Sequence, residues 1–342
     1  MAGVSVNEVA RAASVSIATV SRVINQPNLV SPTTRERVLA AMEQLNYQVN
    51  SAASSLRRGH SKSIALIVAS MSQPWYVKLV RALREEISVK GYDSTIYDVE
   101  HSPEKMMTHL RAATFQGASG VIIATGDFID SPEMVSVIAE TAESIPLVVI
   151  GQGIRDAAWS TVQFDDVRGA FEATKILLDA TKGDVAFLGA LPGSYLARER
   201  LKGYQLAFAQ RDDSRRQAIW DIEKFDYSAG FAVTSARLSR GEHPTAIFCV
   251  NDELALGAMR AINDFGFTVP DDIQVMGFGN TDFLDYLVPS LSSVDGSAVA
   301  AAQVSVSALW HSLEGRGALP TSVLERRIQL RESTGHKTPT IV

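Results

Sequence analysis

The 342-residue sequence contains a single cysteine, Cys249, which excludes an internal disulfide and any metal cluster that needs several cysteine ligands. Because it uses no disulfide, the chain suits a reducing compartment, and we expect a cytoplasmic location. The sequence also lacks a run of about 18 apolar residues, the length that a membrane-spanning helix needs. Its first residues have no charged start followed by an apolar run, so we expect neither a secretion signal nor a membrane partner.

Motifs of catalysis and cofactor binding are missing as well. The histidines show neither of the spacings H-x-x-x-H and H-E-x-x-H that hold zinc on a helix. The sequence has no G-x-x-x-x-G-K-[ST] phosphate loop and no G-x-S-x-G nucleophile motif. Gly277-Phe-Gly-Asn280 lacks the third glycine of a dinucleotide site, and Cys249 lies inside an apolar run, where a thiol is unreactive. We therefore expect a protein that is not an enzyme and that needs no cofactor or metal.

The residues that are present are unevenly distributed. Hydrophobic residues make up 46%, enough for full cores, and the length suggests about two domains at roughly 150 residues each. The net charge is −6, yet residues 1–60 hold six arginines, no lysine and three glutamates, a charge of +3. The remainder holds 26 basic and 35 acidic residues. A small basic head on an acidic body predicts a polyanion-binding module joined to a second kind of domain.

Three short helical patterns fill the basic segment. Ser5 and Glu8 form a capping box at the start of the first helix. Ser16 caps a second helix over residues 17–25, and Ser31-Pro32 opens a third, because proline is favoured in the first turn of a helix. Two short helices joined by three or four residues are typical of a helix-turn-helix DNA-binding domain, although a generic helical hairpin has the same spacing.

The residues of these helices are more specific than their spacing. Val6 to Asn25 reads V-x-x-V-A-x-x-A-x-V-S-x-x-T-V-S-R-V-I-N, and Val30 to Tyr47 reads V-S-P-T-T-R-E-R-V-L-A-A-M-E-Q-L-N-Y. Both closely resemble the DNA-binding head of the LacI/GalR family of bacterial transcription regulators. The resemblance implies an all-α helix-turn-helix domain over residues 1–48, which places the helix at 16–25 in the major groove of double-stranded DNA.

Roles on DNA follow from side-chain chemistry. Arg22 is the expected base reader, because its guanidinium fork matches O6 and N7 of guanine. Ile17 and Ala18 are apolar and suit thymine methyl groups and close approach. The side chains that suit phosphate contacts, although capping or solvation would also use them, are Ser5, Ser16, Thr19, Ser21, Asn25 and Thr34. The family usually has glycine at the turn position of Ser14, a mild departure if the turn does not require a positive φ.

Residues 46–60 resemble the hinge segment of the same family, and we place the hinge at 49–61. By that resemblance Asn50 caps a helix of about two turns, and the two helices of a homodimer pair in the minor groove of a palindromic operator. The paired Leu56 side chains would then wedge into a central base step and kink the DNA. A helix this short needs DNA to fold, so off DNA the segment is a linker. The hinge residues expected on DNA are Asn50, Ala53, Leu56 and Arg57.

From Ser63 onward, short apolar runs alternate with amphipathic helices, which is the α/β pattern of a doubly wound parallel sheet. About 270 residues are too many for one such sheet, so we expect two lobes with a ligand cleft at the carboxyl ends of the strands. The expected strands are 64–69, 93–97, 120–125, 146–150, 184–189, 246–250 and 273–278. The expected helices include 76–90, 166–180, 197–211, 228–239 and 252–265.

The body also resembles the LacI/GalR core and, behind it, the periplasmic sugar-binding-protein fold. Its strongest motif is V-N-D-E-L-A-L-G-A-M-R-A, from Val250 to Ala261. The resemblance implies three crossings between the lobes, with lobe 1 at about 62–162 and 296–320 and lobe 2 at about 163–295 and 321–335. It also implies a repressor controlled by a small-molecule effector, a sugar or related metabolite. A solute-binding protein for transport is the alternative; it shares the body but lacks the basic head.

The resemblance supplies the cleft residues one at a time. Arg200 matches the family's effector-binding arginine, and Asn251 is expected to touch the ligand while Asp252 caps the next helix. Phe164 and Phe225 either stack on a sugar face or pack in the core. The other residues expected in the cleft are Gln73, Trp75, Gly279 and Asn280.

Three cleft positions depart from the family pattern. Gly151 stands where an acidic residue is common, Gly279-Asn280 where Asp-Asp is common, and Gly296 occupies a further cleft position. Carboxylates bind pairs of sugar hydroxyls well, because they accept two hydrogen bonds. Their replacement by glycine predicts a larger cleft with fewer anchors. The effector is then bulkier, or anionic and held by Arg200, or a sugar held differently.

Overall fold

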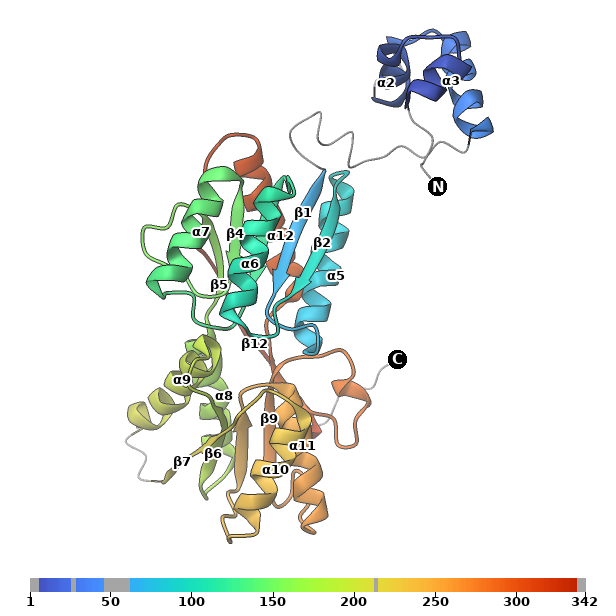
Figure 1. Ribbon diagram of the computed structural model, residues 1–342. Helices are drawn as coiled ribbons and strands as arrows, with labels where there is room; N and C mark the ends of the chain where they lie inside the picture. The colour runs from blue at the N-terminus through green and yellow to red at the C-terminus, as the bar shows by residue number, and fades with distance from the viewer. Residues whose placement is uncertain (1–5, 26–28, 46–61, 212–214, 337–342) are drawn as a thin grey trace. The chain divides into compact units, whose positions relative to one another are not determined.

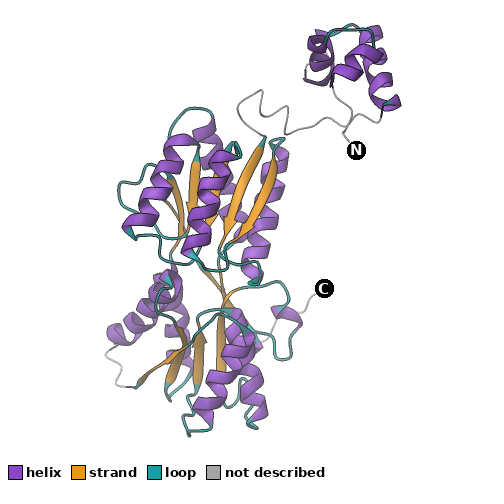
Figure 2. Ribbon diagram, viewed as in Figure 1, coloured by secondary structure: helices purple, strands orange, loops and turns teal. Residues whose placement is uncertain are grey.

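The computed structural model describes residues 6–25, 29–45, 62–211 and 215–336 (Figure 1). By its internal contacts the chain divides into two compact units, residues 1–61 and residues 62–342. The first unit, here called the head, is helical, and the second, here called the core, contains both sheets (Figure 2). Within the described residues, no helix is both long and apolar enough to cross a membrane.

The head forms around one residue of each helix. Its helices are α1 (Val6–Ala12), α2 (Ile17–Asn25) and α3 (Pro32–Gln44). Val9, Val20 and Val38 are fully buried at the centre of a small apolar cluster. Because apolar residues recur with the helical period, each helix turns one face to this cluster and leaves the other in solvent. The predicted three-helix head is confirmed.

The turn between α1 and α2 does require a positive φ. Ser14 has a φ of 52°, in the left-handed region. The turn is a Schellman motif: the N–H of Val15 donates to the carbonyl of Ala10 at 3.0 Å, and the N–H of Ser14 donates to that of Arg11 at 3.2 Å. The strained position in this motif favours glycine, because a β-carbon is crowded there. The serine at position 14 therefore strains the backbone of this turn.

Replacing Ser14 with glycine should stabilise the head by about 1 kcal/mol, because glycine adopts the left-handed conformation without that strain. Hydrogen exchange of the α1 and α2 amides in the full-length protein measures the effect. Ser14→Ala is the control, since alanine keeps the β-carbon and should bring no added protection. Equal protection in both variants would contradict a strained turn.

The core contains two lobes, each built on a sheet. Its described residues form one six-stranded sheet in the order β11-β5-β4-β3-β1-β2 and another in the order β12-β10-β9-β8-β6-β7. The strands of the first are β1 (Ser63–Val68), β2 (Asp93–Asp98), β3 (Gly120–Ala124), β4 (Leu147–Ile150), β5 (Ser160–Phe164) and β11 (Ser322–Leu324). Those of the second are β6 (Val185–Ala190), β7 (Gln217–Asp221), β8 (Ala246–Cys249), β9 (Gln274–Gly279), β10 (Ser292–Asp295) and β12 (Arg327–Gln329).

Helices cover both faces of the sheets (Figure 2). The first lobe has α5 (Pro74–Val89), α6 (Pro103–Phe115), α7 (Pro132–Ser144) and α12 (Ala298–Leu313), and the second has α8 (Asp166–Ala180), α9 (Tyr195–Arg211), α10 (Tyr227–Leu238) and α11 (Asp252–Asp264). Alternate residues of β1 enter different clusters: Leu66 packs with Leu83 of α5, whereas Ile67 packs with Leu110 of α6. A strand buried on both faces reads as a continuous apolar run, which explains why β1 was visible in the sequence. The predicted pair of doubly wound parallel-sheet lobes is confirmed.

The chain crosses between the sheets three times, after β5, after β10 and between β11 and β12. The predicted lobe boundaries at 162/163 and 320/321 fall a few residues early, because β5 runs to Phe164 and β11 occupies 322–324 of the first sheet. The register pairs Val323 with Gln163 in parallel. A three-residue edge strand is too short to give an apolar run, so the sequence did not mark it.

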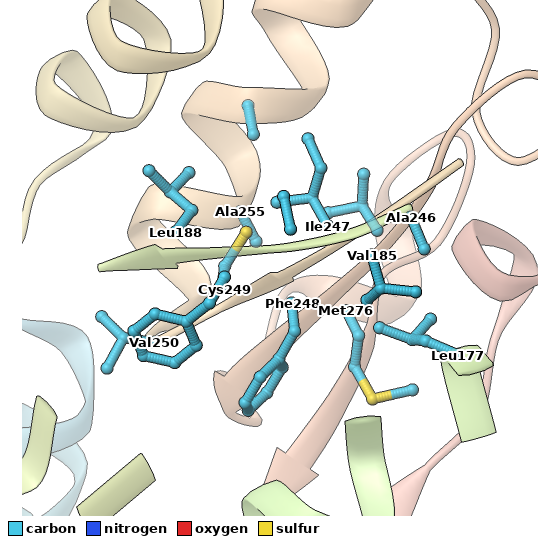
Figure 3. Packing of buried hydrophobic residues seen from close by; sticks show 14 of the residues in the cluster. Leu177, Val185, Leu188, Ala246, Ile247, Phe248, Cys249, Val250, Ala255 and Met276 are labelled. Carbon is cyan, nitrogen blue, oxygen red and sulfur yellow. The ribbon is translucent and has the colours of Figure 1, made fainter. Parts of the chain in front are cut away.

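The single cysteine lies in the core of the second lobe. Cys249 ends β8 and is fully buried, and Figure 3 shows its side chain among apolar neighbours that include Leu188 and Ala255. Burial raises the pKa of the Cys249 thiol well above its ordinary value, so the reactive thiolate is disfavoured. The thiol is a packing group, as its place in an apolar run indicated.

Candidate functional site

One face of α2 is exposed to solvent. Ile17 is 43% exposed, and Ala18, Ser21 and Arg22 are also exposed, whereas Val20 is buried in the head. The period of the helix separates these two sets, so packing of the head leaves the residues at 17, 18, 21 and 22 available together. This is the face predicted to read DNA.

The hydroxyl groups at the helix starts are engaged in local bonds. Ser16 Oγ accepts a hydrogen bond from the N–H of Thr19 at 3.1 Å and lies 2.9 Å from Thr19 Oγ1. Ser31 Oγ donates to Thr34 Oγ1 at 2.9 Å. Capping is thus one role of these side chains, and Asn25 closes α2. The predicted residues Ser5, Asn50, Ala53, Leu56 and Arg57 lie outside the described residues.

A cavity lies between the two lobes, at the carboxyl ends of the parallel strands. The space free of atoms, including the part open to solvent, is about 700 Å³. The first lobe lines it with Gln73, Trp75, Tyr76, Thr125, Ile150, Gly151 and Phe164. The second lobe and the crossings line it with Asp166, Tyr195, Leu196, Arg200, Asn251, Asp252, Glu253, Phe278, Gly279, Thr281 and Arg326.

Two buried arginines in this cavity share one carboxylate. Asp166, at the start of α8, is 4% exposed, and its Oδ1 accepts hydrogen bonds from Arg200 Nε at 2.9 Å and Arg326 Nη2 at 3.0 Å. Arg200 also donates from Nη1 to the carbonyl of Val250. The Arg326 side chain is 3% exposed. The three groups form an ion cluster that is removed from water and joins α8, α9 and the crossing before β12.

Aromatic rings hold both guanidinium groups in place. Arg200 lies 3.7 Å from the ring centre of Phe278, and Arg326 lies 4.0 Å from that of Phe164 and 4.8 Å from that of Phe278. A ring face attracts a cation, and the attraction strengthens away from water. Burial lowers the pKa of Arg326 to about 10, with Asp166 acting in the opposite direction, so the group is still charged at neutral pH.

Two acids at the start of α11 complete the charged lining. Asp252 is 1% exposed; Ser293 Oγ donates to its Oδ1 at 2.6 Å and the N–H of Thr281 donates to its Oδ2 at 3.0 Å. Burial raises the pKa of Asp252 despite these bonds. Burial also raises the pKa of Glu253, from 4.5 to about 7. Both carboxyl groups therefore hold a proton more readily than they would in water.

The expectation that Asp252 caps α11 is wrong. Asn251 is the N-cap of α11, where its Oδ1 accepts a hydrogen bond from the N–H of Leu254 at 2.9 Å. Asp252 instead ties the helix to the next two strands through its bonds to Thr281 and Ser293. Asn251 holds the extended backbone conformation of a cap, which explains the exchange of roles. Both residues still line the cavity.

The cavity gathers most of the predicted effector residues but not all. Gln73, Trp75, Phe164, Arg200, Asn251 and Gly279 line it. Phe225 lines the adjoining outer space and, with Gln73, Arg200 and Asn251, a smaller space beside the cavity; its ring lies 6.3 Å from that of His101. Asn280 turns away: its φ is 53°, and its Oδ1 accepts a hydrogen bond from Arg331 Nη2 at 2.9 Å. The prediction for Asn280 is wrong, because that bond and its backbone direct the amide out of the cavity.

The three glycines do not simply enlarge the cleft. A β-carbon at Gly296 would lie 1.6 Å from Arg326 Nη1, so the guanidinium occupies the space that a side chain would fill. At Gly151, φ is 147° and a β-carbon would lie 2.2 Å from the carbonyl oxygen of Thr125, so this backbone admits only glycine. At Gly279 a β-carbon would lie 3.1 Å from Asp252 Oδ2. At Gly296 the expected gain in volume is therefore wrong, because the Arg326 guanidinium takes up that space.

Sequence reasoning missed the pair Asp166 and Arg326. In the sequence, Asp165-Asp166 reads as a helix cap, and Asp165 is indeed the N-cap of α8. Arg326 stands in the charged run Glu325-Arg-Arg327, which is typical of a solvated connection. Only the crossing of the chain between two sheets buries one of these arginines and leaves Arg327 exposed. A signal was present in the glycine at 296, which leaves room for a long side chain from elsewhere.

The lobes also touch beside the cavity. The N–H of Leu196 donates to the carbonyl of Gly126 at 3.0 Å, and Asp127 and Ser194 form an isolated antiparallel bridge. Leu196 lines the cavity, whereas Asp127 and Ser194 line the outer space that contains Phe225. The contact therefore lies between the two spaces and joins the end of β3 to the start of α9.

Comparison with known families covers both units. The sequence model for bacterial regulatory proteins of the lacI family matches residues 2–50, and that for a periplasmic binding protein-like domain matches residues 174–334. The chain is 32% identical to the HTH-type transcriptional regulator DegA of Bacillus subtilis, over 85% of this chain and 86% of that protein. It is 29% identical to the HTH-type transcriptional repressor PurR of Histophilus somni, over 92% and 93% of the two chains.

Solved structures agree. A lac repressor dimer bound to operator and the anti-inducer ONPF is 26% identical, with a TM-score of 0.85 over 97% of this chain and 99% of that one. A complex of the transcriptional regulator CelR with cellobiose is 25% identical, with a TM-score of 0.70 over 96% and 99%. With the helix-turn-helix head, the two-lobed core and the identity to DegA together, this chain belongs to the LacI family of bacterial transcription regulators.

Proposed function

We propose that this protein is a repressor that binds a palindromic operator as a homodimer and responds to a small effector in the interlobe cavity. The observation that carries the proposal is the exposed face of α2, where Ile17, Ala18 and Arg22 lie in solvent on a basic head. Such a face suits the major groove. The names of the relatives PurR and DegA and the lac repressor dimer on its operator support the same function.

On DNA, Arg22 reads base edges, and Ile17 and Ala18 contact thymine methyl groups. Contacts with phosphates position the head, and they come from hydroxyl groups at the start of or within α2 and α3: Ser16, Thr19, Ser21 and Thr34. The roles proposed for Ser5, Asn25, Asn50, Ala53, Leu56 and Arg57 rest on the family resemblance alone.

The effector acts because the cavity belongs to both lobes. Gln73 of the first lobe and Arg200 of the second line it, so a ligand that contacts both favours one arrangement of the lobes over another. In a homodimer that rotation changes the spacing of the two chain segments that lead to the heads. By linkage, an effector that weakens operator binding itself binds more weakly to the operator complex, by the same factor.

No catalytic step belongs to this proposal. Among the residues that the structure describes, no group of three histidine, cysteine, aspartate or glutamate side chains is placed to hold a metal. A solute-binding protein would explain the core but leaves the head without a role, and the curated relatives named above are regulators. A regulator that works on chromosomal DNA acts in the cytoplasm.

Selection of bound fragments from random DNA by the full-length protein tests the operator proposal. We expect an enriched site with two-fold symmetry, because two identical heads of a homodimer read identical half-sites. Enrichment of an asymmetric site, or no enrichment over bulk DNA, would contradict the proposal. The selected site then serves in the measurements that follow.

Arg22→Ala is expected to weaken binding to the selected operator by about 1–3 kcal/mol and to leave random DNA much less affected, because a base contact is lost. Fluorescence anisotropy at fixed salt measures both affinities, since phosphate contacts make them salt-dependent. Arg37→Ala removes the same charge from the exposed side of α3 and should weaken both DNAs equally. An equal loss for both DNAs in Arg22→Ala would reduce Arg22 to a phosphate contact.

A further inference from the structure

We propose that the effector carries an anionic group, a carboxylate or a phosphate, which binds to the edge of the Arg326 guanidinium beside Arg200. This inference rests on the proposed function and names the class of ligand for the same cavity. It concerns a residue that sequence reasoning did not place in the site.

Two buried arginines of the cavity share one carboxylate. Arg200 and Arg326 both donate to the same oxygen of Asp166, so one carboxylate serves two cations in a space removed from water. Asp252 directs its oxygens to Ser293 and Thr281, within its own lobe. Asp295, which is half-buried near Arg326, also favours the charged form of that arginine. Because both guanidinium groups share one oxygen of Asp166, the Nε–H group of Arg326 remains for an oxygen of an anion.

Arg326 also has a hydrogen-bond donor without an acceptor. Arg326 Nε is buried and has no hydrogen-bond partner among the residues that the structure describes. The side chain is 3% exposed, so water does not readily supply one. Buried donors are nearly always paired in native proteins, and an exception points to a missing partner. An acceptor that enters the cavity beside Arg326 would complete the group.

The orientation of the Arg326 guanidinium also suits an anion. Phe164 and Phe278 lie against the guanidinium of Arg326 and hold its plane, which leaves the edge with its N–H groups for a ligand. That edge matches a carboxylate or phosphate, because two parallel N–H groups meet two oxygens. Gly296 has no β-carbon, and the Arg326 guanidinium fills the space beside it. Arg200, with its Nε bonded to Asp166, lies on the same ring of Phe278 and adds a second cation.

The site also fits a role in control. Asp166 follows the first crossing between the lobes, Gly296 lies at the second, and Arg326 lies at the third. An anion bound at Arg326 therefore acts where rotation of one lobe against the other must occur. A neutral ligand elsewhere in the cavity would not contact Arg326 at these crossings.

The test uses the full-length protein and matched probes at constant ionic strength. The probes are inorganic phosphate, glucose paired with its acids gluconate and glucose 6-phosphate, and galactose paired with galacturonate. Calorimetry measures their binding, and thermal unfolding measures the stabilisation that they bring. We expect phosphate to raise the melting temperature, and at least one acid to bind tenfold or more tightly than its neutral partner. Carboxylate and phosphate arms distinguish the two sources of negative charge.

Variants then locate the anion. Arg326→Gln should weaken the acid at least tenfold and the neutral sugar much less, and Arg326→Lys, which keeps the charge but not the fork, should lie between. Arg327→Gln, one residue away and exposed, is the matched control and should bind like the parent protein. If phosphate and all acids fail to bind, or bind equally to Arg326→Gln, the inference is overturned.

The outcomes separate this inference from the proposed function. A neutral sugar that binds more tightly than its acid and changes operator affinity overturns the anionic site and leaves an effector-controlled repressor standing. An acid that needs Arg326 but leaves operator affinity unchanged supports the site and counts against control of DNA binding by the cavity.

Discussion

Replacing Asp166 with asparagine is expected to destabilise the core by about 3–5 kcal/mol, because the substitution removes the one carboxylate that both Arg200 and Arg326 contact. Loss of one partner from a buried ionic cluster costs more than the cluster contributes as a whole, since the remaining charge stays out of water.

Urea unfolding followed by tryptophan fluorescence measures this loss. The four tryptophans, Trp75, Trp159, Trp220 and Trp310, all lie in the core unit, so the signal reports the core and not the head. Asp165→Asn is the matched control: Asp165 caps α8 by accepting from the N–H of Arg168, and asparagine caps a helix equally well. A loss below about 1 kcal/mol for Asp166→Asn would mean that the two arginines are compensated in another way.

Glu253→Gln is expected to stabilise the protein by about 3 kcal/mol above pH 7 and to have no effect near pH 4. The cause is burial, which raises the pKa of Glu253 from 4.5 to about 7 in the folded chain. Between those values the folded state keeps a proton that the unfolded state releases, so stability falls as the pH rises. Glutamine keeps the shape of the neutral acid and removes this loss.

The groups that face Glu253 do not reverse the sign. Asp252 acts in the same direction as burial, and Arg200 opposes it with a smaller effect. Unfolding in urea at pH 4, 6 and 8 measures the profile. Glu85→Gln, on the exposed side of α5, is the control and should change stability little at any of these pH values. A parallel profile for Glu253→Gln and the parent protein would show that the carboxyl group is hydrated in solution.

Sequence alone predicted what local periodicity determines. The α2 face that exposes Arg22 and buries Val20 follows from the 3.6-residue repeat, and the seven apolar runs became β1–β4, β6, β8 and β9 with ends within one residue. The edge strands β11 and β12 were not predicted, because three residues carry no period. Strands β5, β7 and β10 were also missed, because they mix polar and apolar residues and give no continuous apolar run.

The candidate site was predictable only through the family resemblance. It supplied Gln73, Arg200 and Asn251, and all three line the cavity. Arg326 and Asp166 meet across 160 residues of sequence, and that contact depends on how the crossings are arranged in space. Asn280 failed for a local reason, since its positive φ turns the amide toward Arg331.

The backbone contacts between the lobes affect how fast a ligand dissociates rather than how tightly it binds. They are the bond between Leu196 and Gly126 and the bridge between Asp127 and Ser194. A ligand that exchanges through the outer space leaves only when these backbone groups separate. The equilibrium constant depends on contacts inside the cavity, whereas the dissociation rate depends on how often the lobes part there. Two ligands of different Kd can then share one slow residence time, and the regulator would retain its bound state for a period that the protein sets and the ligand does not.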